Sequence, residues 1–231
     1  MNKKCIMFDC METLIDMTEL PSQRDYAFWA FKGSGCEEYF KDFNDFFMCF
    51  KNAREAILSE IPENKEFTFD EQYRCIVEEK IDDKKKQERA VELLLKNFWT
   101  NYKKRCFVKK EIKDALRYLK SRYTLGVVSN FKIKGGIEEL LEYTEISSFF
   151  KFVINSADIG WRKPHSYIYD YAVKKSGFKK DEIVFIGDSF TNDYEGPRKA
   201  GIKSILLDKG KNDIPMECKK IKNFKLFITK M

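Results

Sequence analysis

Several polar side chains that could bind a cation or an anion stand directly after short apolar segments. These residues are Asp9, Ser129, Asn130, Asp188 and, in the turn after Asp188, Asp193. Three carboxylates at one edge of a sheet would raise one another's pKa unless a cation were bound there. Oxygen ligands without histidine favour a hard cation, Mg²⁺ rather than Zn²⁺. We therefore predict a magnesium site at Asp9, Asp188 and Asp193.

One lysine is placed to balance these carboxylates. Lys163 precedes Pro164, so it is predicted to lie in a loop just before a helix. A lysine there could neutralise the carboxylates and hold a phosphate group. We do not expect a zinc site, because His165 is the single histidine and the seven cysteines include no CxxC pair.

The elements that must position these residues alternate between strand and helix. Short apolar runs predict strands at residues 4–9, 124–128, 152–154, 183–186 and 203–207. Helical spacing or helix-ending glycines predict helices at 112–119, 137–143, 165–175 and 194–200, and a further edge strand is predicted at 225–228. This alternation predicts an α/β fold with a doubly wound parallel sheet. Ligands bind at the carboxyl ends of such strands, where the polar residues fall.

The segment between these strands has a different character. No glycine occurs between Gly35 and Gly126, and Pro62 is the single proline there. Phenylalanines at positions 40, 43, 47 and 50 recur at helical spacing, which predicts an amphipathic helix with an aromatic face. A long segment without turn residues favours a set of helices.

The composition narrows the class of protein. Lys and Arg total 43 and Asp and Glu 37, which gives a net charge of +6 and suits an anionic partner. Basic residues are not interleaved with aromatics as in nucleic-acid-binding motifs, and no window approaches the about 18 apolar residues of a membrane span. Scattered cysteines are typical of reduced thiols. We expect a cytoplasmic protein that binds neither nucleic acid nor membrane.

Four motifs in sequence order carry a resemblance to the haloacid dehalogenase (HAD) superfamily. They are Phe8-Asp9-Cys10-Met11-Glu12-Thr13-Leu14, Gly126-Val127-Val128-Ser129-Asn130, Gly160-Trp161-Arg162-Lys163-Pro164 and Gly187-Asp188-Ser189-Phe190-Thr191-Asn192-Asp193. Members of this superfamily often carry a helical cap domain between the first two motifs. The resemblance implies a Rossmann-like core of residues 1–15 and 106–231 and a helical cap of residues 16–105.

The resemblance also implies roles for individual residues. By similarity, Asp9 attacks a small phosphorylated substrate and forms an aspartyl-phosphate intermediate. Asp9, Asp188 and the backbone carbonyl of Met11 bind Mg²⁺, with Asp193 as a direct or supporting ligand. Ser129 and Lys163 bind the phosphoryl oxygens, and Asn130 is expected to contact the substrate beside them. Charge stabilisation and positioning dominate phosphoryl transfer, which suits this set of residues.

Two positions of the first motif differ from the pattern of family phosphatases. Met11 replaces the aspartate that protonates the leaving group, and Glu12 replaces a glycine. Loss of a general acid typically costs about 10²–10⁴ in rate. The first interpretation is a phosphatase that acts on good leaving groups or uses another acid, with Glu12 or Asp16 as candidates.

Two alternatives remain open at this point. One is a hydrolase of a different substrate, of the dehalogenase type or of the phosphonatase type with a cap lysine. The other is a non-catalytic protein that binds a phosphoryl ligand. Cys10, next to Asp9, is interpreted as a packing residue and His165 as a helix-capping or surface residue.

Overall fold

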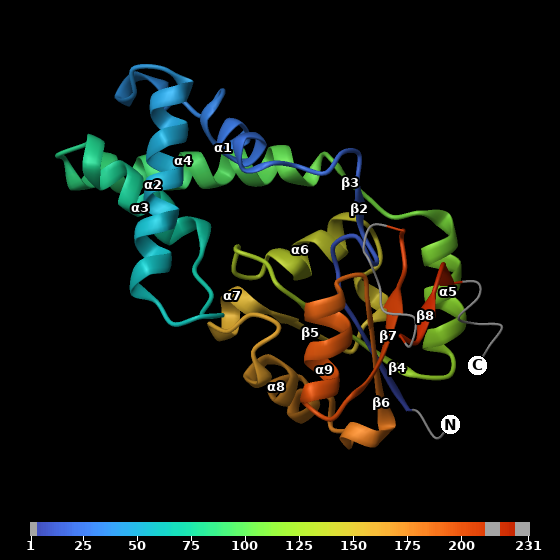
Figure 1. Cartoon of the computed structure of the whole chain (residues 1–231). Helices are drawn as coiled ribbons and strands as arrows, with labels where there is room; N and C mark the ends of the chain where they lie inside the picture. The colour runs from blue at the N-terminus through green and yellow to red at the C-terminus, as the bar shows by residue number, and fades with distance from the viewer. Residues whose placement is uncertain (1–3, 211–217, 225–231) are drawn as a thin grey trace. The chain divides into compact units, whose positions relative to one another are not determined.

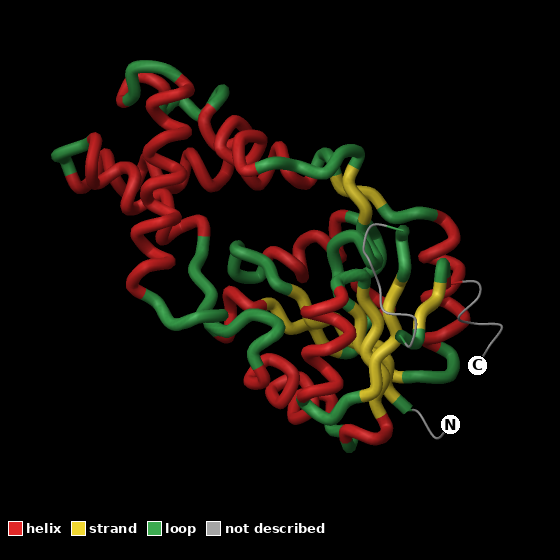
Figure 2. The backbone as a smooth tube through the Cα atoms, viewed as in Figure 1, coloured by secondary structure: helices red, strands yellow, loops and turns green. Residues whose placement is uncertain are grey.

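The computed structural model describes residues 4–210 and 218–224, and these fall into two compact units. One unit contains the described residues up to Asp16 and those from Phe107 onward. The other is Met17–Cys106. Figure 1 shows the elements by name, and Figure 2 shows that the strands gather in the first unit while the second is helical.

The first unit is built on a parallel sheet of six described strands. Its spatial order is β5-β4-β1-β6-β7-β8. The strands are β1 (Cys5–Phe8), β4 (Thr124–Ser129), β5 (Phe152–Asn155), β6 (Ile183–Gly187), β7 (Lys203–Leu207) and β8 (Lys220–Ile221). All of β1 is buried, as expected for a central strand covered on both faces. The predicted α/β fold with a parallel sheet is confirmed, whereas the strand predicted at 225–228 lies outside the described residues.

The strands of this sheet alternate with helices along the chain after residue 109. These helices are α5 (Lys110–Lys120), α6 (Gly136–Tyr143), α7 (Ser156–Ile159), α8 (Ser166–Ser176) and α9 (Gly196–Lys199). Gly177 ends α8 with a φ of 74°, the left-handed conformation in which a helix-ending glycine is favoured. Ile168, Tyr169 and Ala172 of α8 belong to one buried core cluster that also contains Cys5 and Met7 of β1.

The helix predicted at 194–200 differs from the structure at its start, because α9 begins at Gly196. A π-helical turn, Phe190–Glu195, precedes α9. In this turn the N–H of Gly196 reaches back to the carbonyl of Thr191, so the next carbonyl, that of Asn192, would need the N–H of residue 197. Pro197 has no N–H, and the hydroxyl of Tyr169 donates to Asn192 instead, at 2.5 Å.

The second unit consists of four long helices. They are α1 (Gln23–Phe31), α2 (Phe43–Glu60), α3 (Phe69–Lys80) and α4 (Lys84–Lys103), and α4 packs against both α1 and α3. Ser22 and Thr68 start α1 and α3 with reciprocal capping boxes.

The predicted aromatic face of α2 is partly wrong. Phe40 lies before the helix, Phe43 and Phe47 are half-buried, and Phe46 joins Phe50 in the core. Phe46 stacks on Phe31 of α1 with ring centroids 4.9 Å apart, so packing between the helices selects this face.

Two short strands lie where the chain passes from one unit to the other. β2 (Asp16–Met17) and β3 (Cys106–Phe107) form a separate two-stranded sheet. The described residues include all seven cysteines, no disulfide joins them, and five of them are buried. Among the described helices, none combines the length and the hydropathy needed to cross a membrane.

Candidate active site

The carboxyl ends of the central strands bring the predicted acidic residues together. Phe8 of β1 pairs with Ile186 of β6, so Asp9 follows one strand where Asp188 follows its neighbour. The N–H of Asp9 donates to the carbonyl of Ile186 at 2.9 Å, which fixes this register beyond the strand. Oxygens of Asp9, Asp188 and Asp193 lie within 4.8 Å of one another.

Lys163 lies in the middle of this group of carboxylates. Its Nζ donates to Oδ1 of Asp9 and to Oδ1 of Asp193, at 2.7 Å in both cases. The Lys163 residue is only 3% exposed. Burial disfavours the charged amine, but the carboxylates of Asp193 and Asp9 outweigh it and hold the pKa of Lys163 well above its usual value. The site therefore contains a permanent buried cation.

Asp193 is held on both sides of its carboxylate. Oδ1 accepts from Lys163 and Oδ2 accepts from the N–H of Ser189 at 3.0 Å. The carboxylate also lies against Gly187, where an added Cβ would fall 2.4 Å from the carboxyl carbon of Asp193. Only glycine at 187 leaves room for this side chain, which explains the glycine in the Gly187-Asp188 motif.

The carboxylates of this cluster are hard to ionise together. Burial and the charge of Asp9 raise the pKa of Asp188 to about 6. Burial also raises the pKa of Asp193 to about 7, although Lys163 opposes the shift. A divalent cation would relieve the repulsion, and the donors here are all carboxylate oxygens, which suit Mg²⁺. The residues present therefore fit a magnesium ion.

Ser129 and Asn130 end the strand on the other side of β1, and the structure gives them different positions. Ser129 is 1% exposed, and its Oγ has no hydrogen-bond partner among the described residues. Such a buried hydroxyl is available to a ligand.

The amide of Asn130 instead holds the backbone of Lys163. Nδ2 donates to the Lys163 carbonyl at 2.9 Å, and Oδ1 accepts the Lys163 N–H at 2.7 Å. Both ends of the amide are thus engaged within the chain. The expected contact between Asn130 and the substrate stays a prediction. The hydrogen bonds from its amide to the backbone of Lys163 were not predicted.

Residues of the first motif form contacts with distant segments of the chain that the sequence analysis did not predict. Thr13 is buried, and its hydroxyl donates to Oδ1 of Asp188 at 3.3 Å. Lys209 lies after β7, with Nζ 2.7 Å from Oδ1 of Asp16 and 3.7 Å from Oε2 of Glu12. Glu12 has a φ of 59°, a left-handed conformation that usually favours glycine. Because the family pattern has glycine at this position, a left-handed turn at Glu12 could have been predicted from the sequence.

His165 and Cys10 lie where the sequence analysis placed them, at a helix start and in the buried interior. Nδ1 of His165 accepts the N–H of Tyr167 at the start of α8, and its ring stacks on Trp161 with centroids 4.0 Å apart. Cys10 is fully buried.

Comparison with known proteins identifies the family. The model of the haloacid dehalogenase-like hydrolase family matches residues 43–207. Glyceraldehyde 3-phosphate phosphatase of Methanothermobacter thermautotrophicus is 35% identical over 91 residues, 39% of this chain and 40% of the relative. Haloacid dehalogenase-like hydrolase domain-containing protein 3 of Homo sapiens is 33% identical over 95 residues, 41% of this chain and 37% of the relative. The matched segments span less than half of these relatives.

Solved structures match nearly the whole chain and establish the fold. A 2-haloacid dehalogenase from Pseudomonas syringae pv. Tomato DC3000 has a TM-score of 0.81 at 18% identity, over 98% of this chain and 97% of that one. A putative HAD hydrolase from Bacillus subtilis, described as bound to magnesium, has a TM-score of 0.63 at 17% identity over the same fractions. With four motifs in order, this fold and a family match over most of its length, the chain belongs to the haloacid dehalogenase-like hydrolase family.

Proposed function

We propose that this hydrolase is a Mg²⁺-dependent phosphatase of small phosphorylated molecules with Asp9 as its nucleophile. The main support is the geometry of Lys163, whose buried ammonium lies 2.7 Å from Asp9 in the unit that also carries the unpartnered hydroxyl of Ser129. Asp9 is an anion that must approach an anionic phosphoryl group, so a fixed cation beside it lowers the repulsion. Relatives named as phosphatases also favour this reaction over dehalogenation.

The proposed division of labour assigns recognition to the helical part. Residues 16–105 would form the cap domain, and residues 1–15 and 106–231 the catalytic core. The compact unit Met17–Cys106 and the position of that segment between the first two motifs support this assignment. In this arrangement the core carries the reaction and the cap selects the substrate.

The metal would be held by Asp9, Asp188 and the backbone carbonyl of Met11. Asp193 would bind the ion directly or support the site, since one of its oxygens lies within 4.8 Å of ligand oxygens of Asp9 and Asp188 and its carboxylate is held by Lys163 and Ser189. Thr13, which donates to Asp188, would orient that ligand. When bound, the ion would neutralise charge on the phosphoryl oxygens.

The chain's own groups would carry the phosphoryl transfer. An oxygen of Asp9 forms a bond to phosphorus while the bond from phosphorus to the leaving oxygen breaks. Ser129 and Lys163 hold the remaining phosphoryl oxygens during this transfer. The oxygen of a water molecule then forms a bond to phosphorus while the bond from phosphorus to the Asp9 oxygen breaks, which releases inorganic phosphate and regenerates the Asp9 carboxylate.

Met11 restricts the leaving group. Asp16 is a poor replacement acid: burial disfavours its carboxylate, but hydrogen bonds from Lys209 and Lys109 outweigh this and lower its pKa. A carboxyl that stays ionised has no proton to donate. The Glu12 side chain lies 3.7 Å from the same Lys209. We therefore propose substrates whose leaving group departs without protonation, such as acyl phosphates.

Hydrolysis of acetyl phosphate and p-nitrophenyl phosphate tests this function. The assays compare the protein with Mg²⁺, with EDTA, and as the Asp9→Asn variant with Mg²⁺. We expect turnover in the first sample and a loss of about a thousandfold or more in the other two. Equal rates in all three would exclude the mechanism through Asp9 and a divalent cation. Chloride release from a 2-haloacid in EDTA would instead establish dehalogenation.

A further inference from the structure

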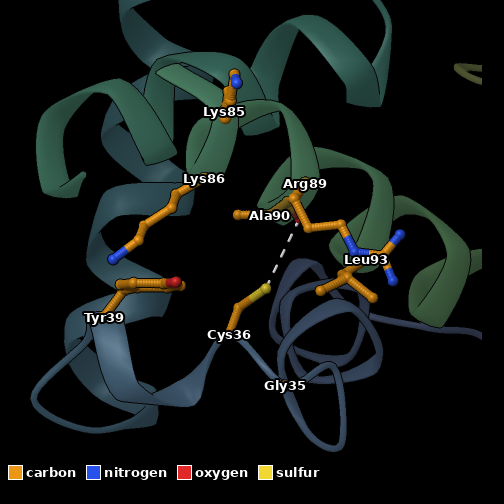
Figure 3. A pocket seen from close by; sticks show the side chains of 8 residues that line it. All are labelled: Gly35, Cys36, Tyr39, Lys85, Lys86, Arg89, Ala90 and Leu93. Atoms are coloured by element: carbon orange, nitrogen blue, oxygen red, sulfur yellow. Dashed lines mark hydrogen bonds between the residues drawn. The ribbon is translucent and has the colours of Figure 1, made fainter. Parts of the chain in front are cut away.

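A cavity of about 210 Å³ lies within the helical unit Met17–Cys106. It is lined by Gly35, Cys36, Tyr39, Lys85, Lys86, Arg89, Ala90 and Leu93. Figure 3 shows that one wall comes from the first turns of α4 and the other from the loop at Gly35 and the short 3₁₀ helix η1 (Glu37–Tyr39). None of these residues belongs to the cluster of Asp9, Asp188 and Asp193.

Three of the lining side chains are exposed cations, and two of the acidic side chains nearby already have partners. The Glu37 carboxylate accepts the N–H groups of Gly33 and Gly35, at 2.6 and 2.9 Å. Glu88 of α4 forms an ion pair with Arg74 of α3.

The two lysines of the cavity lie next to the N-cap Asp83, whose carboxylate accepts the backbone N–H of Lys86 at 2.9 Å. In the part of the chain that the structure describes, neither Lys85 nor Lys86 has an ion pair, while Arg89 contacts Glu92 at 3.2 Å. Both lysines also lie in the first turn of α4, where the helix dipole disfavours cations. A bound anion would compensate for that unfavourable placement.

The rest of the lining is apolar and holds an aromatic ring that has no aromatic partner. Buried Cys36 and Ala90 form part of the lining, and the Cys36 thiol points to the carbonyl of Ala90, as Figure 3 shows. Most aromatic side chains of this unit contact another ring in edge-on, tilted or stacked geometry, whereas the ring of Tyr39 pairs with none among the described residues. In Figure 3 the side chain of Lys86 extends toward Tyr39.

We propose that this cavity binds a small phosphate monoester or phosphonate that carries one flat apolar ring. The phosphate or phosphonate group would contact the ammonium of Lys86, which extends toward Tyr39, and the ring would pack on Tyr39. The volume is below the roughly 300–1,000 Å³ of pockets for drug-sized ligands. The cavity therefore suits a single ring rather than a dinucleotide.

Calorimetric titration of the full chain with phenylphosphonate tests the proposal. The probe cannot be hydrolysed as a phosphate ester, and EDTA removes metal-dependent binding. The informative variant is Lys86→Gln, and Lys84→Gln is its matched control, because Lys84 lies in the same turn of α4 but does not line the cavity. Any binding at Asp9 and Lys163 is common to both variants and cancels in the comparison.

We expect Lys86→Gln to weaken phenylphosphonate binding about tenfold and Lys84→Gln to leave it nearly unchanged. Equal weakening by both variants would mean diffuse attraction to a basic surface and would overturn the proposal. Unchanged binding in both, or no binding by the unaltered chain, would overturn it as well.

A second comparison tests the ring. The unaltered chain should bind phenylphosphonate more tightly than methylphosphonate, and Tyr39→Ala should remove that preference while weak binding of methylphosphonate persists. A preference that survives Tyr39→Ala would contradict the proposed position of the ring. Circular dichroism confirms that each variant is folded before titration.

Discussion

Replacement of Lys163 by methionine should destabilise the protein strongly, and more at high pH than at low pH. Methionine keeps much of the volume of the side chain but removes the ammonium between Asp9 and Asp193. Loss of one partner from a buried ion pair costs about 3–5 kcal/mol. In a chain of this size, that loss corresponds to a decrease in Tm of about 10 °C.

The pH dependence follows from Asp193. Its pKa is raised to about 7, above the value in an unfolded chain, so its contribution to stability is complete at low pH and declines as the pH rises through 7. Without Lys163, both Asp9 and Asp193 must be buried as anions at high pH, whereas protonation of Asp193 relieves the repulsion at low pH. The loss in Tm should therefore be larger at about pH 8.5 than at about pH 5.5.

Thermal unfolding in EDTA measures this effect, and Lys180→Met is a matched control. Lys180 forms an ion pair with Asp170 at the same 2.7 Å, but both side chains are about half exposed. Such a surface pair contributes about 1 kcal/mol or less. If Lys163→Met lowers the Tm no more than Lys180→Met, or equally at both pH values, the reasoning from burial is refuted.

Three further variants test the site. Met11→Asp should restore a general acid and raise hydrolysis of alkyl phosphates by about 10²-fold or more; an unchanged kcat would mean that another group already protonates the leaving oxygen. Gly187→Ala should displace Asp193 and cost about 1–3 kcal/mol in urea unfolding, and unaltered stability with full activity would contradict the close contact. Asn130→Ala should lower kcat about tenfold through loss of two hydrogen bonds to Lys163; a change in KM alone would point to a substrate contact instead.

The positions of the polar residues around the sheet can largely be predicted from sequence. Each strand is a short run of buried side chains, and the predicted segments 183–186 and 203–207 coincide with β6 and β7 to within one residue. Because parallel strands share a carboxyl edge, residues that follow them must converge, as Asp9 and Asp188 do.

Contacts between distant segments could not be predicted in this way. The amide of Asn130 reaches the backbone of a residue 33 positions away, and no local pattern encodes that pairing. In α2, phenylalanines three and four residues apart are compatible with more than one buried face, and packing against Phe31 selects Phe46. The cavity at Tyr39 likewise depends on how two segments of the helical unit meet.

The hydrogen bond from Tyr169 to Asn192 has a consequence for how the site keeps its shape. Tyr169 belongs to α8, which starts three residues after Lys163, while Asn192 immediately precedes Asp193. One hydroxyl thus joins the two segments that supply the buried ion pair, and its ring is anchored in the hydrophobic core. Core packing around Tyr169 therefore fixes the positions of the charged side chains Lys163 and Asp193. Apolar substitutions around this ring should lower kcat even where they leave the fold intact.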